Sequence, residues 1–162
     1  MAGQRVRRLN LERAISKMLA TFDPRRRRVH LELSMKSEID AISPFVDELM
    51  LRIRETHCDP GSEFAIELAL REALANAVLH GNGQDSKKRV HVRCECDEGS
   101  GVSLVIRDEG PGFDPAAVAD PLAPENLDAE HGRGILLMRQ FMDDIHFERG
   151  GTEVHMRKRP TG

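Results

Sequence analysis

Two absences limit the classes of protein to which this chain can belong. It has only three cysteines in 162 residues, and an odd number of cysteines without a secretion signal argues against a disulfide-stapled secreted domain. No apolar run approaches the ~20 residues that a transmembrane helix requires. The N-terminal segment MAGQRVRRLN also lacks the apolar core of a signal peptide. We therefore expect a soluble cytoplasmic protein that does not associate with a membrane.

The cysteines do not form a metal-binding pattern either. Cys94 and Cys96 alternate on an expected strand and so share one face. No second Cys/His pair lies at the spacing of a zinc site, and the seven histidines are scattered along the chain. We expect buried, reduced thiols rather than a metal centre.

An excess of basic charge is likewise missing. The net charge is −3 and the isoelectric point is about 6.2, so the whole chain lacks the electrostatic signature of a nucleic-acid-binding protein, and we expect no direct contact with nucleic acid. Hydrophobic residues make up 40% of the sequence, which is typical of a globular protein. The length suffices for one domain with its own core.

Residues 1–28 are interpreted as an N-terminal arm that precedes the main domain at 29–162. Asn10 could cap a short helix with an apolar stripe formed by Leu11, Ile15, Met18, Leu19 and Phe22. The run DPRRRR that follows could be a basic docking arm for a partner. A solvated linker is the favoured interpretation, because short charge runs are usually solvated.

The remaining sequence alternates between strand and helix periodicity. The expected elements are, in chain order, a strand at 29–35, a helix from Ser37 or from Ser43, a helix at 62–80, strands at 89–96 and 102–108, a loop at 114–131, a helix at 134–142, and strands at 144–148 and 152–158. This order predicts an α/β two-layer sandwich with a mainly antiparallel mixed sheet and helices on one face.

The helix at 62–80 contains an unusual polar stripe. Glu72, Asn76 and His80 are four residues apart, so they line up along one face that borders the apolar side of the helix. The carbonyl oxygen of Asn76 is a hard, neutral ligand suited to Mg²⁺, and the carboxylate of Glu72 could accept a proton from an attacking hydroxyl. Alone, the pair could equally be an ordinary solvated surface pair.

A second segment, VIRDEGPGFDP, places Asp108 at the end of a strand and Gly110 and Gly112 in the turn after it. A carboxylate in this position could accept a hydrogen bond from an exocyclic amine such as that of adenine, and glycine permits close backbone approach to a ligand. An ordinary turn is the alternative, because Asp, Gly and Pro are common turn residues.

A third segment, HGRGILLM, leads from a loop into a helix. Gly132 and Gly134 flank Arg133 at the expected helix start, where free backbone N–H groups and the helix dipole favour an anion. Two glycines of this spacing are a weak motif by themselves, and an ordinary loop-to-helix junction is the alternative.

Taken together and in this order, the three segments resemble a known family. EALANAVLHGN, DEGPGF and GRG resemble the N, G1 and G2 boxes of the Bergerat-fold (GHKL) ATPases, and GGT at 150–152 resembles the short adenine-side motif before the last strand. The resemblance covers roughly residues 29–159. Within this family, the chain length and the presence of Glu72 make the sequence most similar to the anti-sigma-factor serine/threonine kinases of the RsbW-like type. Sensor histidine kinases differ, because they carry a segment with a phospho-accepting histidine ahead of the ATPase domain, and no such segment precedes residue 60 here.

The resemblance implies ATP and Mg²⁺ as cofactors and assigns roles on the polar helix and the strand end. Asn76 would hold Mg²⁺ against the ATP phosphates, and Glu72 would be the general base for a partner's serine hydroxyl. Asp108 would bond the adenine amino group. Gly110 and Gly112 belong to the same motif, with Gly112 letting the base lie close.

The resemblance also implies a moving lid. The loop at 114–131 would close over the nucleotide and bring Gly132, Arg133 and Gly134 against the phosphates. Thr152 would help to bind adenine through water.

By the same resemblance, the partners would be a STAS-type anti-sigma-factor antagonist that is phosphorylated and a sigma factor that is sequestered, with a homodimer possible. Two alternatives stay open: a module that binds ATP and acts by protein contact without kinase activity, and a detached histidine-kinase ATPase domain. Glu72 favours transfer to a hydroxyl, because a hydroxyl must lose its proton whereas an imidazole needs less help.

Overall fold

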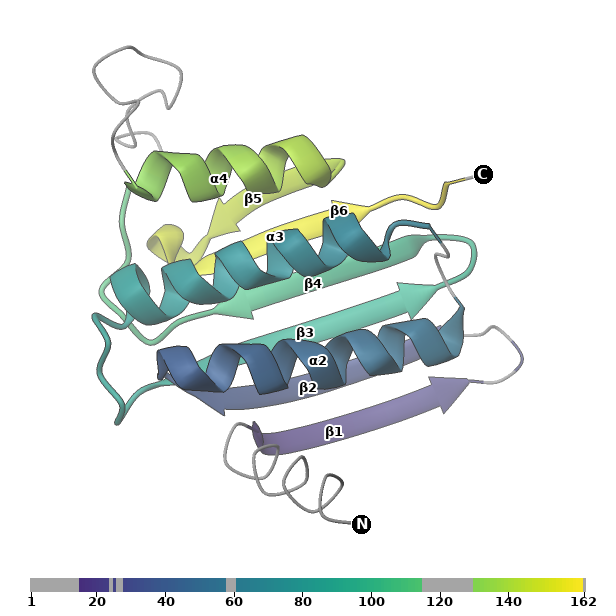
Figure 1. Cartoon of the computed structure of the whole chain (residues 1–162), viewed down its shortest axis with the longest axis horizontal. Coiled ribbons are helices and arrows are strands. Elements are labelled where there is room, and N and C mark those ends of the chain that lie inside the picture. Colours follow the sequence, from purple (N-terminus) through teal and green to yellow (C-terminus); the bar gives the residue numbers. More distant parts are fainter. Residues whose placement is uncertain (1–14, 24, 26–27, 58–60, 115–129, 162) are drawn as a thin grey trace.

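The computed structural model describes residues 15–23, 25, 28–57, 61–114 and 130–161. Six strands form one sheet in the order β1-β2-β3-β4-β6-β5, and every pair of neighbours in it is antiparallel. Three long helices lie side by side on one face of this sheet (Figure 1). The predicted two-layer α/β sandwich is confirmed, with a wholly antiparallel sheet in the part of the chain described.

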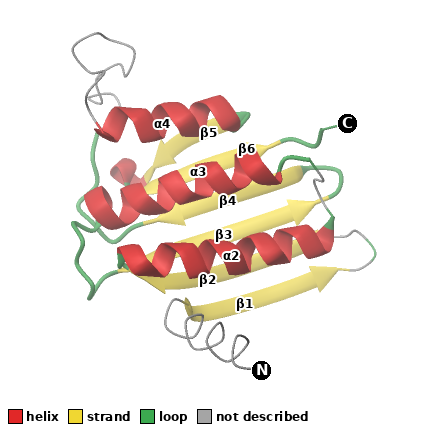
Figure 2. Cartoon of the chain, in the orientation of Figure 1, coloured by secondary structure: helices red, strands yellow, loops and turns green. Residues whose placement is uncertain are grey.

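From β2 onward the elements follow the expected order (Figure 2). The strands are β1 (Ile15–Asp23), β2 (Arg28–Lys36), β3 (Arg89–Asp97), β4 (Gly101–Arg107), β5 (Asp144–Glu148) and β6 (Glu153–Lys158). The helices are α2 (Ile39–Thr56), α3 (Glu63–Asn76), the π-helical turn η1 (Ala77–Gly81), α4 (Glu130–Phe141) and the 3₁₀ turn η4 (Arg149–Gly151). Among these helices none has the length and apolar character needed to cross a membrane.

The sheet is amphipathic because its strands alternate with period two. The side chains facing the helices are apolar and buried, including Leu31, Leu33, Val90, Val92, Leu104, Ile106, Val154 and Met156. The opposite face carries polar and charged side chains. Burial of the first set against α2, α3 and α4 is the main driving force for the two-layer arrangement.

Strand β1 corrects one prediction. The apolar spacing from Ile15 to Phe22 predicted a helix, but residues 15–23 pair with β2 as the edge strand of the sheet. The Asp23 carboxylate accepts a hydrogen bond from the N–H of Arg25 at 2.9 Å, which favours a turn here. The short connection keeps the segment beside the free edge of β2, and strand pairing overrides the helical pattern. Asn10 and Leu11 lie outside the described residues, and the boundary at residue 29 stays a prediction.

Helix α2 settles the choice between the two predicted starts. It runs from Ile39 to Thr56 with Pro44 inside it, so the start at Ser43 is wrong. Its buried side is formed by Ala41, Ile42, Phe45, Val46, Leu49, Met50 and Ile53. A proline within the second turn leaves most of the helical hydrogen bonds intact, and the buried apolar side supplies the stabilisation that keeps the helix whole.

The cysteines differ from one another. Cys94 is a free, fully buried thiol, and burial raises its pKa to about 12, so it behaves as an inert core residue. Cys96 is disulfide-bonded, and the expectation of reduced thiols is therefore wrong for Cys96. Its position near the end of β3 brings its sulfur to 3.4 Å from the hydroxyl oxygen of Thr56 at the end of α2.

Candidate functional site

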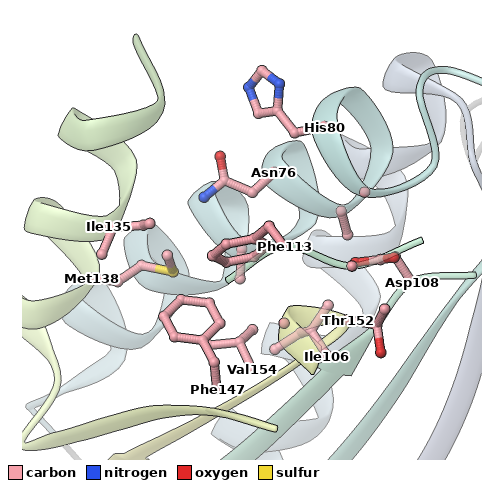
Figure 3. A pocket seen from close by; sticks show the side chains of 15 residues that line it. Asn76, His80, Ile106, Asp108, Phe113, Ile135, Met138, Phe147, Thr152 and Val154 are labelled. Atoms are coloured by element: carbon pink, nitrogen blue, oxygen red, sulfur yellow. The ribbon is translucent and has the colours of Figure 1, made fainter. Parts of the chain in front are cut away.

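A cavity of about 300 Å³ opens between α3, α4 and the ends of β4 and β6 (Figure 3). Its volume lies at the lower end of the range for small-molecule sites. The lining residues are Ala73, Asn76, Ala77, His80, Gly81, Ile106, Asp108, Gly112, Phe113, Ile135, Met138, Phe147, Gly151, Thr152 and Val154. The polar members are few and lie around a mostly apolar interior, which is the usual composition of a site that orients one ligand.

The sheet topology explains why the cavity lies here. Strands β4 and β6 are antiparallel neighbours, so the end of β4 lies beside the start of β6, with Arg107 opposite Glu153. The pairing continues into the loops, because the N–H of Asp108 donates to the carbonyl of Thr152 at 3.0 Å. Two of the predicted segments therefore meet at one end of the sheet.

Gly112 brings these two loops into close contact. Its φ is +82°, in the left-handed region that favours glycine. A side chain at this position would collide with the carbonyl of Gly150. The next residue, Phe113, donates its N–H to the same carbonyl at 2.8 Å. Gly112 thus fixes the wall of the cavity through a backbone contact that a side chain would prevent.

Asp108 lies half-buried beside η1. Its Oδ1 accepts a hydrogen bond from the N–H of Gly110 at 2.8 Å. Burial raises the pKa of Asp108 above its ordinary value, and the hydrogen bond from Gly110 opposes that shift. The backbone of Gly81 packs closely against the Asp108 carboxyl group, so the carboxylate is held in place at the cavity wall from both sides.

Asn82 is a positioning residue whose role was not predicted. It is buried, its Nδ2 donates to the carbonyl of Arg89 at 2.9 Å, and its Oδ1 accepts from the N–H of Glu109 at 2.8 Å. It therefore ties the end of η1 to the start of β3 and to the loop after Asp108. The sequence shows Asn82 directly after Gly81, but it could not predict the role of Asn82, because the two backbone groups that it binds are distant in the chain.

Two members of the polar stripe, Asn76 and His80, line the cavity, and Glu72 lies one helical turn before Asn76 on α3. Glu72 and Asn76 are both half-buried, and neither side chain forms a hydrogen bond or an ion pair with another described residue. On the same helix, by contrast, Glu67 accepts a hydrogen bond from Arg71 at 3.0 Å. Polar groups at partly buried positions are normally paired. The unpaired amide of Asn76 points from α3 toward α4 (Figure 3).

Gly134 lies directly against this stripe. A Cβ atom built at position 134 would be 2.9 Å from Oε2 of Glu72 and 3.3 Å from Nδ2 of Asn76. The absence of a side chain is what lets α4 pack so closely on α3. The predicted helix start is corrected here: α4 begins at Glu130, so Gly132 and Arg133 lie inside its first turn and Gly134 in its second. The lid segment 115–129 lies outside the described residues.

Apolar side chains complete the cavity. Phe113 and Phe147 form an edge-to-face pair with ring centroids 5.3 Å apart, and α4 contributes Ile135 and Met138. The sequence did not single out these four residues, because apolar residues in strands and helices carry no signal that separates a cavity wall from a filled core.

The predicted site residues thus differ in how close they lie to the cavity. Asn76, Asp108, Gly112 and Thr152 line the cavity. Gly110 and Gly134 lie against the lining residues Asp108 and Asn76, and Glu72 lies against Gly134. Arg133 is exposed in α4. The roles of these residues in catalysis and ligand binding stay predictions.

Comparisons with known proteins agree with this architecture. The family described as histidine kinase-like ATPase domain matches residues 35–158. The chain is 34% identical to the anti-sigma F factor of Priestia megaterium over 113 residues, which cover 65% of this chain and 77% of the relative. It is 30% identical to the anti-sigma F factor of Geobacillus stearothermophilus over 145 residues, which cover 82% and 92%. The family match spans the three long helices, the strands β3 to β6 and the cavity, and the chain therefore belongs to the family of histidine kinase-like ATPase domains.

Proposed function

We propose that this protein is an ATP-dependent serine/threonine kinase that acts as an anti-sigma factor. It phosphorylates a STAS-type anti-sigma-factor antagonist and sequesters a sigma factor. The name of its relatives, anti-sigma F factor, supports the second of these two activities. ATP and Mg²⁺ are its cofactors. A homodimer, its location in the cytoplasm and the treatment of residues 29–162 as the kinase domain are parts of the same proposal.

The observation that carries this proposal is the pair of side chains Glu72 and Asn76, which have no partner among the described residues and lie at the α3 side of an apolar cavity. Both side chains are half-buried, and they lie one helical turn apart. A metal ion and a polar substrate would satisfy them. Asp108 and Thr152 lie on the opposite side of the cavity, where an adenine ring would be bound.

The residues present fit ATP and Mg²⁺ chemically. Asn76 offers a neutral oxygen, which suits an ion that keeps several waters and phosphate oxygens as ligands. The apolar walls formed by Ile106, Phe113 and Met138 suit a flat base. Bound Mg²⁺–ATP would supply the transferable phosphoryl group.

The chain's own part in the transfer is positioning and proton removal. Glu72 would accept the proton of the partner's serine or threonine hydroxyl as the oxygen becomes a nucleophile. Asn76 would hold the metal ion one turn away from that carboxylate. Asp108 would accept a hydrogen bond from the exocyclic amine of adenine and fix the other end of the nucleotide.

A direct assay tests the proposal. The purified chain is incubated with γ-labelled ATP, Mg²⁺ and candidate STAS-type antagonists encoded near its gene, and the labelled site is mapped. Label on a serine or threonine of the antagonist supports a serine/threonine kinase. Label on a histidine would instead support the detached histidine-kinase domain, and ATP binding without transfer would support the protein-contact module.

Substitution of Asp108 by asparagine is expected to abolish the preference for ATP over GTP. A hydrogen bond to a charged group contributes about 1.5–3 kcal/mol, so the dissociation constant for ATP should rise about tenfold or more while that for GTP changes little. Calorimetric titration with both nucleotides measures this. Equal affinity of the unsubstituted protein for ATP and GTP would show that Asp108 does not discriminate between adenine and guanine.

Substitution of Gly134 by alanine is expected to reduce phosphoryl transfer while leaving the fold stable. The new methyl group would displace the end of the Glu72 side chain, and a displacement near 1 Å can cost about 100-fold in rate. Alanine is the better helix former by about 0.5–1 kcal/mol. Thermal unfolding and the transfer assay are compared with Gln140→Ala, an exposed change on the same helix. Full activity in Gly134→Ala would mean that the close contact with Glu72 has no catalytic role.

A further inference from the structure

The face of the sheet away from the helices carries a compact group of histidine and glutamate side chains on the β5–β6 hairpin. His146 is directly opposite His155, and Glu148 is directly opposite Glu153. Because strand residues two apart share a face, the two cross-strand pairs form a square on the open side of the sheet. This group lies outside the cavity and has no role in the proposed kinase function.

The ligating atoms of this group already converge. Nε2 of His146 is 3.2 Å from Oε1 of Glu148, and Nε2 of His155 is 3.3 Å from Oε2 of the same carboxylate. Nε2 of His155 is also 2.7 Å from Oε1 of Glu153. One ligand atom from each of His146, Glu148 and His155 lies within 4.8 Å of the other two.

These separations suit a tetrahedral metal ion. Zn²⁺ binds histidine nitrogen and carboxylate oxygen at about 2.0–2.2 Å, and two ligands of a tetrahedron at that distance are about 3.3–3.6 Å apart. Each His–Glu148 separation is close to this edge length, although His146 faces Oε1 of the carboxylate and His155 faces Oε2. The imidazole rings are stacked with centroids 4.7 Å apart, so a small rotation of the exposed His146 ring would complete the approach.

Of the two carboxylates in the group, Glu148 is the better placed to face a cation. Arg149 already pairs with Glu153 at 3.1 Å, whereas the ion pairs of Glu148 are with the two histidines. Imidazole together with carboxylate is a donor set that favours zinc and similar transition metals over Mg²⁺, which prefers oxygen ligands alone.

We propose that His146, His155 and Glu148, with Glu153 or water as the fourth ligand, form a binding site for a Zn²⁺-class divalent transition metal ion on the open face of the β5–β6 hairpin. Binding joins the two strands side chain to side chain. The same hairpin presents Phe147 and Val154 to the cavity from its other face, so the ion stabilises a structural wall of the nucleotide site without touching the nucleotide.

The test is calorimetric titration of metal-free full-length protein with ZnCl₂ in an excess of Mg²⁺ and without nucleotide. We expect one Zn²⁺ per chain and a rise in the unfolding temperature on binding. His155→Ala and His146→Ala should each lower the affinity by about tenfold or more. The matched control is His91→Ala, which removes a histidine of the same face that pairs with a single carboxylate, Glu109, at 2.9 Å and should bind Zn²⁺ unchanged.

Two results would overturn the site: no saturable Zn²⁺ binding to the unsubstituted protein, or equal affinity in the His155→Ala, His146→Ala and unsubstituted proteins. His146 is mostly exposed, so its replacement leaves the fold intact, and cooperative unfolding of each variant confirms that loss of binding is local. Nucleotide binding is measured separately, so failure of the metal site and failure of the kinase proposal give different results.

Discussion

Replacing Glu72 with glutamine is expected to slow phosphoryl transfer to the partner protein by about 10²–10⁴-fold, the usual contribution of a general base. Glutamine keeps the size and shape of the side chain but cannot accept the hydroxyl proton. Transfer is measured with labelled ATP under single-turnover conditions, so that the chemical step is separated from product release.

Nucleotide affinity and stability should stay unchanged in Glu72→Gln, because the Glu72 carboxylate has no partner in the described structure that the substitution would remove. The matched control is Glu67→Gln on the same helix, which removes a hydrogen-bonded partner of Arg71 away from the cavity and should leave transfer intact. An unchanged rate in Glu72→Gln would remove Glu72 from the catalytic role.

The second large effect is expected for Asn76→Ala, which should lose Mg²⁺-dependent nucleotide binding. Removing even an outer-shell partner of a bound metal commonly costs 10–100-fold in affinity, so loss of a direct ligand should raise the dissociation constant for ATP in Mg²⁺ by at least about tenfold. Calorimetry in Mg²⁺ and in EDTA separates the metal-dependent part of the affinity from the part contributed by the base.

Unfolding cannot explain such a loss, because the side chain of Asn76 makes no hydrogen bond with another described residue and alanine is the better helix former. The EDTA titration is the internal control, since the two proteins should have the same affinity there. If Asn76→Ala binds ATP as tightly as the unsubstituted protein in Mg²⁺, the ion is held by other groups.

Periodicity was sufficient to predict most of the fold. The alternation in β2 and β3 and the apolar face of the helix predicted at 62–80 are properties of local sequence. The apolar residues with helical spacing from Ile66 to Val78 are buried in the structure. The relative position of Asn76 and Asp108 also followed from the sequence, because three motifs in a fixed order resemble a family with a common arrangement.

Features that depend on distant partners were not predictable. β1 is a strand because it pairs with the otherwise unpaired edge of β2, and the local sequence of residues 15–23 does not indicate that such an edge is available. Asn82 holds two backbone groups that lie 7 and 27 positions further along the chain. The early start of α4 was missed because its first residues carry no apolar period.

The strand order has a consequence for synthesis of the protein. β6 is inserted between β4 and β5 although it follows both in the chain, so a nascent polypeptide that has emerged from the ribosome only as far as β5 lacks the strand that joins them. Such pairings between distant segments form slowly, and until they form the unpaired strand edges are exposed and prone to aggregation. The cavity wall that β6 contributes through Val154 is therefore absent until this last strand has been made.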